Sequence, residues 1–407
     1  MRNSSAAPVA YDFAPVPPLA APLRVLTLID SLTWGGAETL LGDLAAGAPS
    51  AGIELSVGYL KEIDGSPAAA GLRRHGVEPE LVAVDRMRDP AALARLRRHL
   101  RRVNADVVHT HLGLADVLGT LAARSLGMPT VSTIHLVAGQ STGRPSDQTR
   151  RARARMRLAA LVRRRAGDRV IAVSEAAREA YLLQRWDRPR RVVTVHNGIA
   201  RELRADAGAA VRAELGIAPD ALVLSTVTVL RQGKGHDVAI EAVARLLPDF
   251  PKLRLVVLGD GSAREQIRRL AEPLGDAVIF TGHRGDPMAV LAATDVLVHP
   301  TLMDAFPTAL LEAAASRVPV IATNVGGVPE IVQDRETGVL LEFPPTGQAI
   351  AAELARLLED PSLRSRIGER AEQRFLECFT AARWAARLRE VYDAVLIERG
   401  RPPAGAP

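Results

Sequence analysis

Short apolar strands and helices alternate along this chain of 407 residues, and the alternation limits the folds available to it. Six strands are predicted in the first half: Arg24–Ile29, Glu54–Tyr59, Glu80–Val84, Asp106–Thr110, Thr130–Ile134 and Arg169–Val173. Stretches with helical spacing separate them. Strands that alternate with helices of this length form right-handed βαβ units around a parallel sheet. The first half therefore predicts a doubly wound α/β domain.

A second series of the same kind follows. Its predicted strands are Ala221–Val229, Arg254–Leu258, Ala277–Thr281, Asp295–His299 and Val318–Thr323. The chain is too long for one ordinary core, and Asn197-Gly198 with the polar, alanine-rich residues after it is typical of a linker. We expect two Rossmann-like domains facing across a cleft, at 23–200 and 201–380, after a disordered Pro- and Ala-rich tail at 1–22.

The last predicted helix, Ala381–Glu398, follows the second domain. Its apolar residues Trp384, Leu388, Tyr392 and Val395 recur at the spacing of one helical face. We expect this face to pack against another part of the protein.

Composition narrows the function classes. The net charge is +6, and arginines cluster between Arg150 and Arg165. Nucleic acid, an anionic membrane surface and a solvated helix face each explain such a cluster. With aromatic residues at 3%, the cluster lacks stacking platforms, which argues against nucleic acid. The membrane and the solvated face stay equal alternatives.

Cys378 is the single cysteine, which excludes an intrachain disulfide and a cysteine metal cluster. No apolar run is long enough to span a bilayer, and the N-terminus lacks the pattern of a secretory signal. We expect a cytoplasmic protein, with peripheral contact at the inner membrane face as the alternative.

A glycine pair, Gly35-Gly36, stands between the first strand and a helix at Thr39–Ala46. Free backbone N–H groups at such a helix start form an anion site. The spacing is not G-x-G-x-x-G, so the dinucleotide fingerprint is absent and a nicotinamide-dependent oxidoreductase is disfavoured.

Two cations follow the first strand of the second domain, in Arg231-Gln-Gly-Lys234-Gly235. Glycines let the backbone approach a ligand closely, while Arg231 offers a planar fork and Lys234 a point charge for phosphate oxygens. An ordinary surface loop with two cations is the alternative. The position at the carboxyl end of a strand favours phosphate.

The stretch from His299 to Ile331 carries two acids, Asp304 in a loop and Glu312 in a helix that starts near Pro307. An acid in the apolar part of a helix is costly unless a partner meets it. Eight residues apart on a helix would rotate the two acids by about 80°, so spacing alone does not pair them. We expect them to contact different parts of one ligand; for Glu312 the alternative is an exposed helix glutamate.

His135 ends a strand and is expected to face the cleft from the first domain, with an ordinary loop residue as the alternative. His109 and His111 lack a third ligand at usable spacing, and there is no Asp-x-Asp, so we expect no metal. Ser174, Ser225 and Ser316 lack a Gly-x-Ser-x-Gly setting, so none of the three supports a nucleophilic-serine hydrolase.

Taken together, these motifs resemble the retaining nucleotide-sugar glycosyltransferases of family 4, from about Leu23 to about Leu396. The carriers are Trp34-Gly-Gly-Ala-Glu38, Asp106-Val-Val-His-Thr-His111, Ile134-His135, Val173-Ser174-Glu175, His196-Asn-Gly198, Arg231-x-x-Lys234-Gly235, Leu258-Gly-Asp-Gly261, Phe280-Thr-Gly-His283, Asp304-x₇-Glu312, Val318-Pro-Val-Ile321 and Gly326-Gly327. Each is weak alone, but the order and the spacings make the set specific.

The resemblance implies the GT-B architecture, with an acceptor-binding first domain, a donor-binding second domain and a last helix that crosses back to the first domain. It implies a retaining transferase that moves a hexose-type sugar from a UDP-, GDP- or ADP-sugar to a polysaccharide, glycolipid or other glycan acceptor, with no metal and no cofactor. A non-catalytic nucleotide-sugar-binding protein is the alternative; the retained Arg231, Lys234 and Glu312 argue against it.

The resemblance also implies roles for residues. Glu312 would accept hydrogen bonds from the ribose hydroxyls, and Arg231 and Lys234 would stabilise the diphosphate as charge builds on it. Asp304 and His135 would contact the donor sugar near its anomeric centre.

The remaining donor-binding residues are those that surround the phosphates: Gly35, Gly36, Phe306, Pro307 and Thr308. Amides at Gly35-Gly36 and at the start of the helix after Pro307 would face the phosphate oxygens.

The chain departs from the family pattern at three positions, where Asp304 replaces a Glu, Pro307 replaces a Gly and Arg317 replaces a Gly. The first two leave the donor sugar open. If the backbone at Arg317 is left-handed, a non-glycine residue there costs about 1–2 kcal/mol.

Overall fold

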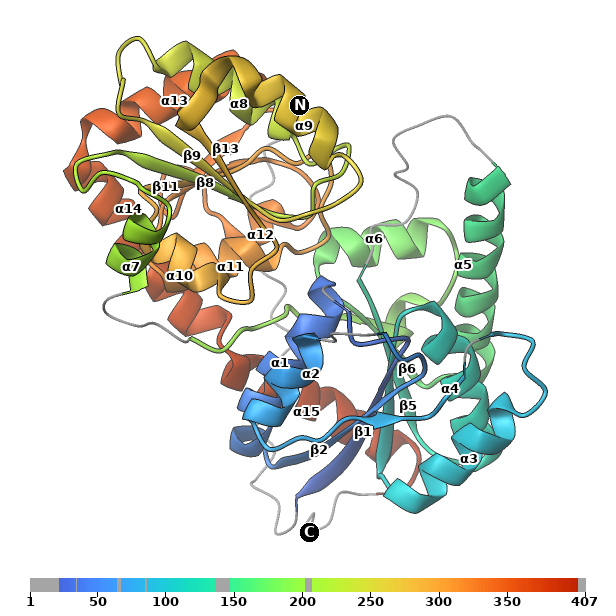
Figure 1. Ribbon diagram of the computed structural model, residues 1–407. Helices are drawn as coiled ribbons and strands as arrows, with labels where there is room; N and C mark the ends of the chain where they lie inside the picture. The colour runs from blue at the N-terminus through green and yellow to red at the C-terminus, as the bar shows by residue number, and fades with distance from the viewer. Residues whose placement is uncertain are drawn as a thin grey trace.

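A computed structural model describes residues 22–33, 35–63, 67–84, 86–135, 147–201 and 207–401. Except for Pro22, the predicted tail lies outside the described residues, as does Trp34. The chain forms two parallel sheets flanked by helices, one above the other in Figure 1. The predicted doubly wound α/β fold is confirmed.

The first sheet has seven parallel strands in the order β3-β2-β1-β4-β5-β6-β7. Its strands are β1 (Leu23–Ile29), β2 (Ile53–Tyr59), β3 (Glu80–Leu81), β4 (Val107–His111), β5 (Thr130–Ile134), β6 (Arg169–Ala172) and β7 (Val192–Thr194). The helical segments between them are α1 (Gly36–Gly47), η1 (Ala48–Ala51), α2 (Pro67–Arg74), α3 (Ala92–Val103), α4 (Gly113–Ser125), α5 (Asp147–Ala166), α6 (Glu175–Leu183) and η2 (Pro189–Arg191).

The second sheet has six strands in the order β10-β9-β8-β11-β12-β13, also parallel. Its strands are β8 (Val223–Val227), β9 (Arg254–Leu258), β10 (Val278–Gly282), β11 (Val296–His299), β12 (Val320–Thr323) and β13 (Val339–Leu341). The helical segments are α7 (Ala207–Glu214), α8 (His236–Leu246), α9 (Arg264–Ala271), η3 (Glu272–Ala277), α10 (Pro287–Ala292), α11 (Thr308–Ala315), α12 (Val328–Ile331), α13 (Gly347–Glu359), α14 (Pro361–Cys378) and α15 (Ala381–Glu398).

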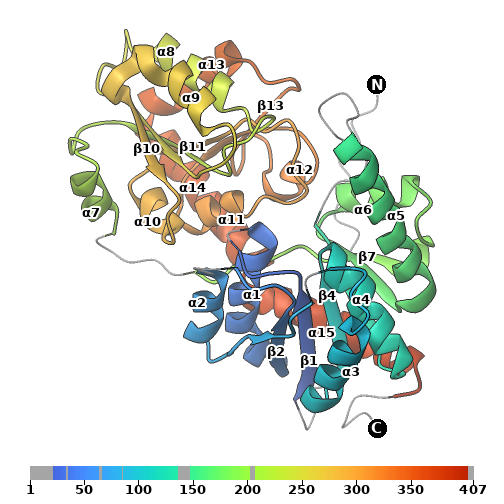
Figure 2. The ribbon, with the colours of Figure 1, turned by 45° about the vertical axis from the view of Figure 1, so that its right-hand side comes forward.

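Strands up to Thr194 belong to the first sheet and strands from Val223 onward to the second. The exact domain boundary near residue 200 stays a prediction. In both sheets the carboxyl ends of the strands face the other domain, so the loops that follow them meet between the domains (Figures 1 and 2). This edge of an open parallel sheet is where ligands usually bind.

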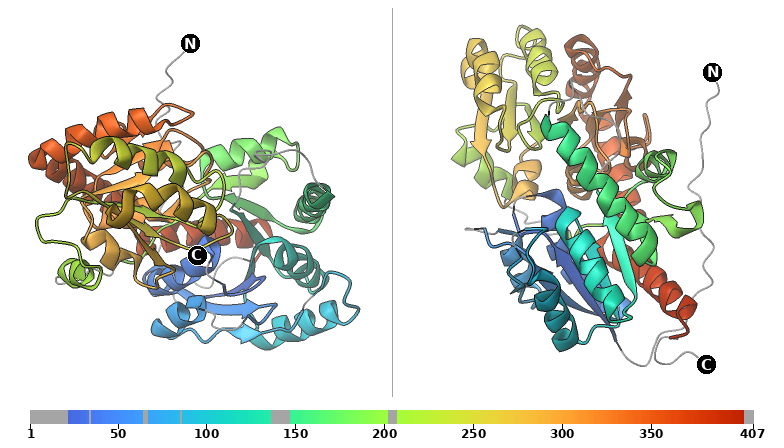
Figure 3. Two further views of the ribbon diagram at one scale, coloured as in Figure 1. Left: turned by 45° about the horizontal axis from the view of Figure 1, so that its top comes forward. Right: turned by 90° about the vertical axis from the view of Figure 1, so that its right-hand side faces the viewer.

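The last helix returns to the first domain, as predicted. In α15, Trp384, Leu388 and Tyr392 are buried, and the helix packs against α1 and η1 (Figure 3). Arg389 on α15 also donates to the backbone oxygens of Ala51 and Gly52 at 3.1 and 2.9 Å. The helix therefore carries the end of the chain across to the face of the first sheet that α1 covers.

The two chain segments that pass between the domains run side by side. The backbone of Ile199 bridges that of Thr380, with Ile199 N donating to Phe379 O and Ala381 N donating to Ile199 O. A side chain at Gly198 would lie 2.4 Å from the carbonyl oxygen of Thr380, so only glycine fits there. The two crossings form one short paired connection.

Arg317, which follows α11, has φ +58 and is left-handed, as the helix end requires. Its carbonyl oxygen lies against Gly368 of α14, and its Nε donates to Glu372 at 2.6 Å. The predicted strain at this non-glycine helix end is therefore present, and an ion pair to α14 accompanies it.

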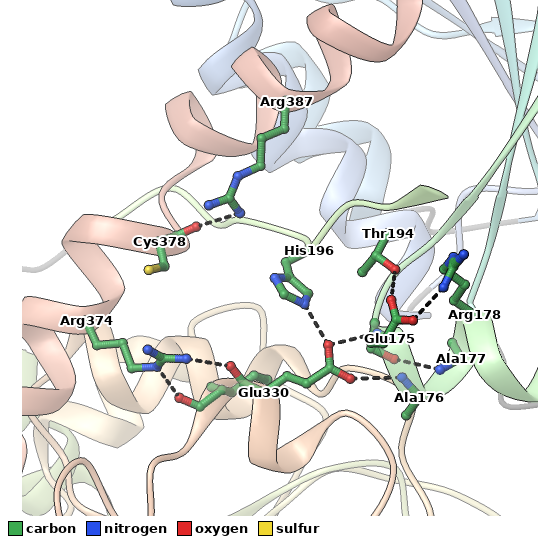
Figure 4. A network of polar contacts seen from close by, with 12 residues as sticks. Glu175, Ala176, Ala177, Arg178, Thr194, His196, Glu330, Arg374, Cys378 and Arg387 are labelled. Carbon is green, nitrogen blue, oxygen red and sulfur yellow. Dashed lines mark hydrogen bonds and ion pairs between the residues drawn. The ribbon is translucent and has the colours of Figure 1, made fainter. Parts of the chain in front are cut away.

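A carboxylate from the second domain caps a helix of the first. Glu330 on α12 accepts hydrogen bonds from the backbone N–H groups of Glu175 and Ala176, at 2.8 and 3.0 Å. It also lies 2.7 Å from Nε2 of His196 (Figure 4). Free N–H groups and the helix dipole favour a negative charge at the start of α6. Glu330 therefore joins the domains through charge-assisted hydrogen bonds.

An aromatic cluster lies beside this contact. The rings of Phe306 and His196 stack with centroids 4.9 Å apart, and Phe379 meets Phe306 edge to face at 5.8 Å. Phe306 and Phe379 are buried. Apolar packing thus reinforces the polar contact of Glu330 at the domain interface.

We predict that Glu330→Ala will accelerate hydrogen exchange at the amides of Glu175 and Ala176 by tenfold or more. Each amide loses a hydrogen bond to a charged acceptor, worth roughly 1.5–3 kcal/mol. Exchange measured by mass spectrometry or NMR on the full chain tests this.

The matched control is Asp360→Ala, because Asp360 caps α14 within the second domain by accepting from Leu363 N at 2.9 Å. That variant should leave exchange at Glu175 and Ala176 unchanged. Equal exchange in both variants would show that Glu330 does not cap α6 in solution.

Candidate functional site

The loop after β8 brings the two predicted cations to the carboxyl edge of the second sheet. Gly233 and Gly235 in this loop have φ +83 and +73, and a side chain at Gly235 would lie 2.0 Å from the carbonyl oxygen of Pro300. The loop between β8 and α8 is thus held tightly against the segment that follows β11. That contact sets the positions of Arg231 and Lys234.

Lys234 is buried and its Nζ lies 2.5 Å from Oδ2 of Asp304. Nε2 of His299 stands 3.4 Å from the same oxygen, at ion-pair rather than hydrogen-bond distance. Burial alone would raise the pKa of Asp304, but His299 and Lys234 outweigh it and hold that pKa well below its usual value. The loops therefore bring together a buried lysine and a largely buried aspartate whose ionised form is favoured.

Arg231 differs from Lys234 because its side chain is exposed. Among the described residues no carboxylate pairs with its guanidinium. An unpaired planar cation beside a buried lysine is suited to bind an anion with more than one charged oxygen.

Gly326 and Gly327 pack against the loop that carries Asp304. A side chain at Gly326 would lie 1.9 Å from the carbonyl oxygen of Asp304, and one at Gly327 would lie 2.0 Å from that of Ala305. Gly327 also lies against Ser174, at the start of α6 in the first domain. The glycine pair therefore fixes Asp304 and brings its loop to the domain interface.

Two helix starts flank the ion pair. α8 begins after Gly235 and α11 begins at Thr308 after Pro307, and neither has a side-chain cap. The first N–H groups of a helix lack intrahelical acceptors, so uncapped starts favour an anion. Both helix starts lie next to the loops that carry Lys234 and Asp304. Phosphate oxygens match this arrangement.

Of the donor-site residues predicted around Pro307, only some lie at the start of α11 beside the Lys234–Asp304 pair. Pro307 is the N-cap residue of α11 and Thr308 is the first helical residue, one position later than predicted. The side chain of Phe306 is packed against His196 and Phe379, so it supports the interface. The predicted contact between Phe306 and the donor therefore concerns only its backbone, and it stays a prediction.

Glu312 lies on α11 between buried residues and faces the first domain. Burial raises the pKa of its carboxyl group to about 7, and the charge of Asp43 on α1 adds to the shift. No described residue donates a hydrogen bond to this carboxylate. Figures 1 and 2 both show an end of α1 close to α11. A mostly buried carboxylate without a donor is costly, and hydroxyl groups are the kind of donor that would offset this cost.

Gly35 is the N-cap residue and Gly36 the first residue of α1, so the helix starts three residues earlier than the predicted Thr39. The carboxylate of Glu38 folds back there: a side chain at Gly35 would lie 2.0 Å from Glu38 Oε2. Oε1 of Glu38 accepts from Thr33 Oγ1 at 3.0 Å, and burial raises the pKa of this acid. An acid therefore occupies the space where a phosphate was expected, so phosphate contact at Gly35-Gly36 requires Glu38 to turn away.

His135 follows β5 at the carboxyl edge of the first sheet, where it was expected. Its Nε2 lies 2.9 Å from Nδ1 of His111, and burial lowers the pKa of His135 to about 4. Within the described residues no group of three metal-ligating side chains is close enough to hold an ion. The loop after His135, up to residue 146, lies outside the description.

The arginine-rich helix α5 carries both exposed and buried arginines. Arg153, Arg155 and Arg157 are exposed, whereas the side chains of Arg150 and Arg151 lie outside the description. Arg163 belongs to the predicted arginine cluster by sequence but not to an exposed basic surface. It is buried, and its Nη1 lies 2.5 Å from Asp116. Within the described part of the chain, no helix has the length and apolar composition needed to cross a membrane.

Sequence reasoning missed the residues that hold the site from across the fold. His299 ends β11 beside Asp304, and Glu330 docks on α6. Tyr392 on α15 contacts His109 at 2.7 Å. The partners of Glu330 and Tyr392 lie 134 or more residues away along the chain, so no local spacing marks them.

The sequence is similar to that of known glycosyltransferases along most of its length. Residues 34–203 match the family model described as Glycosyltransferase Family 4, and residues 209–374 match the one described as Glycosyl transferases group 1. A D-inositol 3-phosphate glycosyltransferase of Thermobispora bispora is 31% identical over 401 residues, covering 91% of this chain and 93% of that protein. The enzyme of the same name from Streptomyces avermitilis is 35% identical over 313 residues, covering 72% of this chain and 66% of that protein.

Solved structures agree on the architecture. The Anabaena HepE protein in complex with UDP-glucose superposes with a TM-score of 0.78 at 22% identity, covering 91% of this chain and 100% of that chain. Sucrose-phosphate synthase of Thermosynechococcus elongatus gives 0.74 at 20% identity, covering 92% and 100%. At these identities the likeness shows the fold, and the predicted GT-B architecture is confirmed.

We predict that Glu312→Gln will stabilise the ligand-free protein, and more so at pH 8 than at pH 5. The pKa is raised from 4.5 when unfolded to about 7 when folded. The wild type therefore loses stability as the pH rises through this window, and the uncharged variant does not. The gain at pH 8 should be on the order of 2 kcal/mol.

Urea unfolding at both pH values measures this gain, with Glu359→Gln as a control at an exposed helix position. The control should change stability little at either pH. A Glu312→Gln protein that is less stable than the wild type at pH 8 would mean that Glu312 has a partner in solution.

Proposed function

Because the chain belongs to glycosyltransferase family 4, we propose that it transfers a hexose from a UDP-sugar to an acceptor hydroxyl, with retention of configuration and without a metal ion. One observation carries the proposal. A lysine–aspartate ion pair and a mostly buried acid stand near the carboxyl edge of one sheet, in Lys234, Asp304 and Glu312, and no described residue donates a hydrogen bond to the carboxylate of Glu312.

The diphosphate of the donor is assigned to Lys234 and Arg231. Lys234 has three N–H groups and spends one on Asp304, which leaves two for phosphate oxygens. Asp304 then acts first as a positioning residue, since it holds the ammonium in place. Its Oδ1 has no partner among the described residues and is the atom we assign to the predicted sugar contact.

The nucleoside is assigned to Glu312. A vicinal diol presents two O–H donors that match the two oxygens of one carboxylate. Hydrogen bonds to the ionised form favour that form, so binding should lower the pKa of Glu312 from its ligand-free value of about 7. Nucleotide binding thereby relieves the cost of this buried acid.

The chemistry follows from the placement of charge. The acceptor oxygen attacks the anomeric carbon on the face from which the phosphate leaves, the bond from that carbon to the phosphate oxygen breaks, and the acceptor proton passes to the departing diphosphate. Negative charge grows on the leaving group, where two fixed cations and the starts of α8 and α11 stabilise it. No protein nucleophile is assigned.

Donor and acceptor classes come from the comparisons. HepE was solved with UDP-glucose, which makes UDP-sugars the first donors to assay, ahead of GDP- and ADP-sugars. The curated relatives are named D-inositol 3-phosphate glycosyltransferases, so inositol phosphate joins glycan and lipid-linked acceptors as a candidate. The acceptor is expected to bind on the first domain, beside His135.

A non-catalytic nucleotide-sugar-binding protein remains the second candidate, and the free Oδ1 of Asp304 and the placement of His135 argue for catalysis over binding alone.

We also propose peripheral contact with an anionic membrane through α5. Leu158 and Leu161 are 41% and 42% exposed there, among the exposed arginines of the same helix. Apolar side chains beside basic ones suit a lipid surface.

We predict that UDP will raise the unfolding temperature of the protein and that Arg231→Ala and Lys234→Ala will each reduce the shift. A ligand at one hundred times its dissociation constant adds about 2.7 kcal/mol to the free energy of unfolding. A thermal-shift series with UDP, GDP, ADP and their sugars measures this, with each variant compared to its own ligand-free midpoint.

The control is the pair Arg245→Ala and Lys252→Ala, which removes two exposed cations of the same domain. These variants should keep the full shift. An unchanged midpoint with all three nucleotide diphosphates would rule out the transferase proposal.

A further inference from the structure

Three histidines and a tyrosine form a chain of contacts between the carboxyl edge of the first sheet and α15. His109 and His111 lie on β4 with ring centroids 4.3 Å apart, and His135 follows at 5.2 Å from His111. Nδ1 of His109 lies 2.7 Å from Tyr392 Oη, and its Nε2 lies 2.7 Å from Thr133 Oγ1. His109 and His111 are buried, whereas His135 is partly exposed.

Burial favours the neutral form of all three imidazoles. Burial lowers the pKa of His109 to about 3 and that of His135 to about 4, and it also holds that of His111 well below its usual value. A neutral imidazole has one N–H donor and one bare nitrogen. The 2.9 Å contact between His111 Nδ1 and His135 Nε2 therefore holds one proton, on one of the two rings.

Two arrangements are possible. If His135 Nε2 carries the proton, His111 must place its own proton on Nε2, which is buried and has no hydrogen-bond partner among the described residues. If His111 Nδ1 carries the proton, Nε2 of His111 is merely a bare lone pair. Buried N–H groups without an acceptor are rarer than unpaired acceptors, so the second arrangement is favoured.

We propose that His111 is a positioning residue that holds His135 in the tautomer with its proton on Nδ1, so that His135 presents a fixed, neutral N–H donor to an oxygen of the substrate. That His135 faces a sugar substrate rests on the proposed function. The tautomer itself does not.

The crossover helix supports this arrangement from below. His111 pairs in register with Thr133 of β5, and Thr133 also holds Nε2 of His109. Tyr392 of α15 fixes the other side of the His109 ring. The ring of His111 thus rests on one that is hydrogen-bonded at both nitrogens, which limits its rotation. A helix at the end of the chain thereby helps to orient a residue in the cleft.

One chemical consequence separates this assignment from a general-base role for His135. Its Nε2 lone pair accepts from His111 and its Nδ1 carries a proton, so neither nitrogen is available to take the proton of the acceptor hydroxyl. His135 instead donates to a substrate oxygen, and the acceptor proton passes to the departing phosphate.

The tautomer is tested on the full, ligand-free chain labelled with ¹⁵N at histidine. Two-bond ¹H–¹⁵N spectra distinguish a protonated ring nitrogen from a bare one, and the His135→Gln variant assigns the signal. We expect Nδ1 of His135 to be protonated and Nε2 bare from pH 6 to pH 8. A protonated Nε2 in the wild type would overturn the proposal.

Variants at His111 test its role. In His111→Asn the amide places a donor near the position of Nδ1 and should preserve the His135 tautomer, whereas His111→Leu should yield a mixture. An unchanged His135 spectrum in His111→Leu would also overturn the proposal. Should the leucine variant not fold, the wild-type and His111→Asn spectra still decide the matter.

The values of kcat and KM distinguish a positioning role of His111 from a purely structural one. With a turned-over donor, His111→Leu should lower kcat about tenfold, as expected for one lost hydrogen bond, with KM for the donor within about twofold. His111→Asn should recover most of kcat, and failure to do so contradicts the positioning role. Absence of turnover in the wild type would count against the proposed function, while the spectra would still test the tautomer.

Discussion

The ion pair between Lys234 and Asp304 is the interaction on which the proposed phosphate site depends. Removing two charges from water is costly, and their attraction compensates only when the geometry is good and further partners are present. Here His299 assists on the acid side, and glycines hold both loops by close backbone contact, at Gly235 against Pro300 and at Gly326 against Asp304 itself. A site that already bears this cost holds the Lys234 ammonium in place, and under the proposed function a leaving phosphate would develop its charge beside it.

Helix starts show which anion positions the protein fills for itself. Asp30 accepts from the first amides of α4 at 2.7 and 3.1 Å, Glu330 accepts from those of α6, and Glu38 folds back over the start of α1. The starts of α8 and α11, beside Lys234 and Asp304, have no such side chain. These two uncapped starts are the ones that lie next to the ion pair, where we assign the donor diphosphate. Glu330 meanwhile uses a helix start to join the domains.

Much of the fold follows from local pattern, because strand alternation and helix periodicity show in any window of the sequence. Both parallel sheets and the apolar packing face of the last helix were predicted in this way. The return of that helix to the first domain was expected from the family resemblance, not from local pattern. The short strand β13 and helix α12 were not, since three or four residues show no period. The cations and acids were located by their positions at strand ends. What they contact was not, because Asp304 meets Lys234 and Phe306 meets His196 only once distant segments are folded together.

Calorimetric titration of UDP tests the central claim, that fixed cations of the protein hold the diphosphate, most directly. The titration is run once in excess chelator and once in excess Mg²⁺. If Arg231, Lys234 and the two helix starts supply the positive charge, the dissociation constant in chelator should stay within about threefold of that in Mg²⁺. Binding that disappears in chelator and returns with Mg²⁺ would contradict the account.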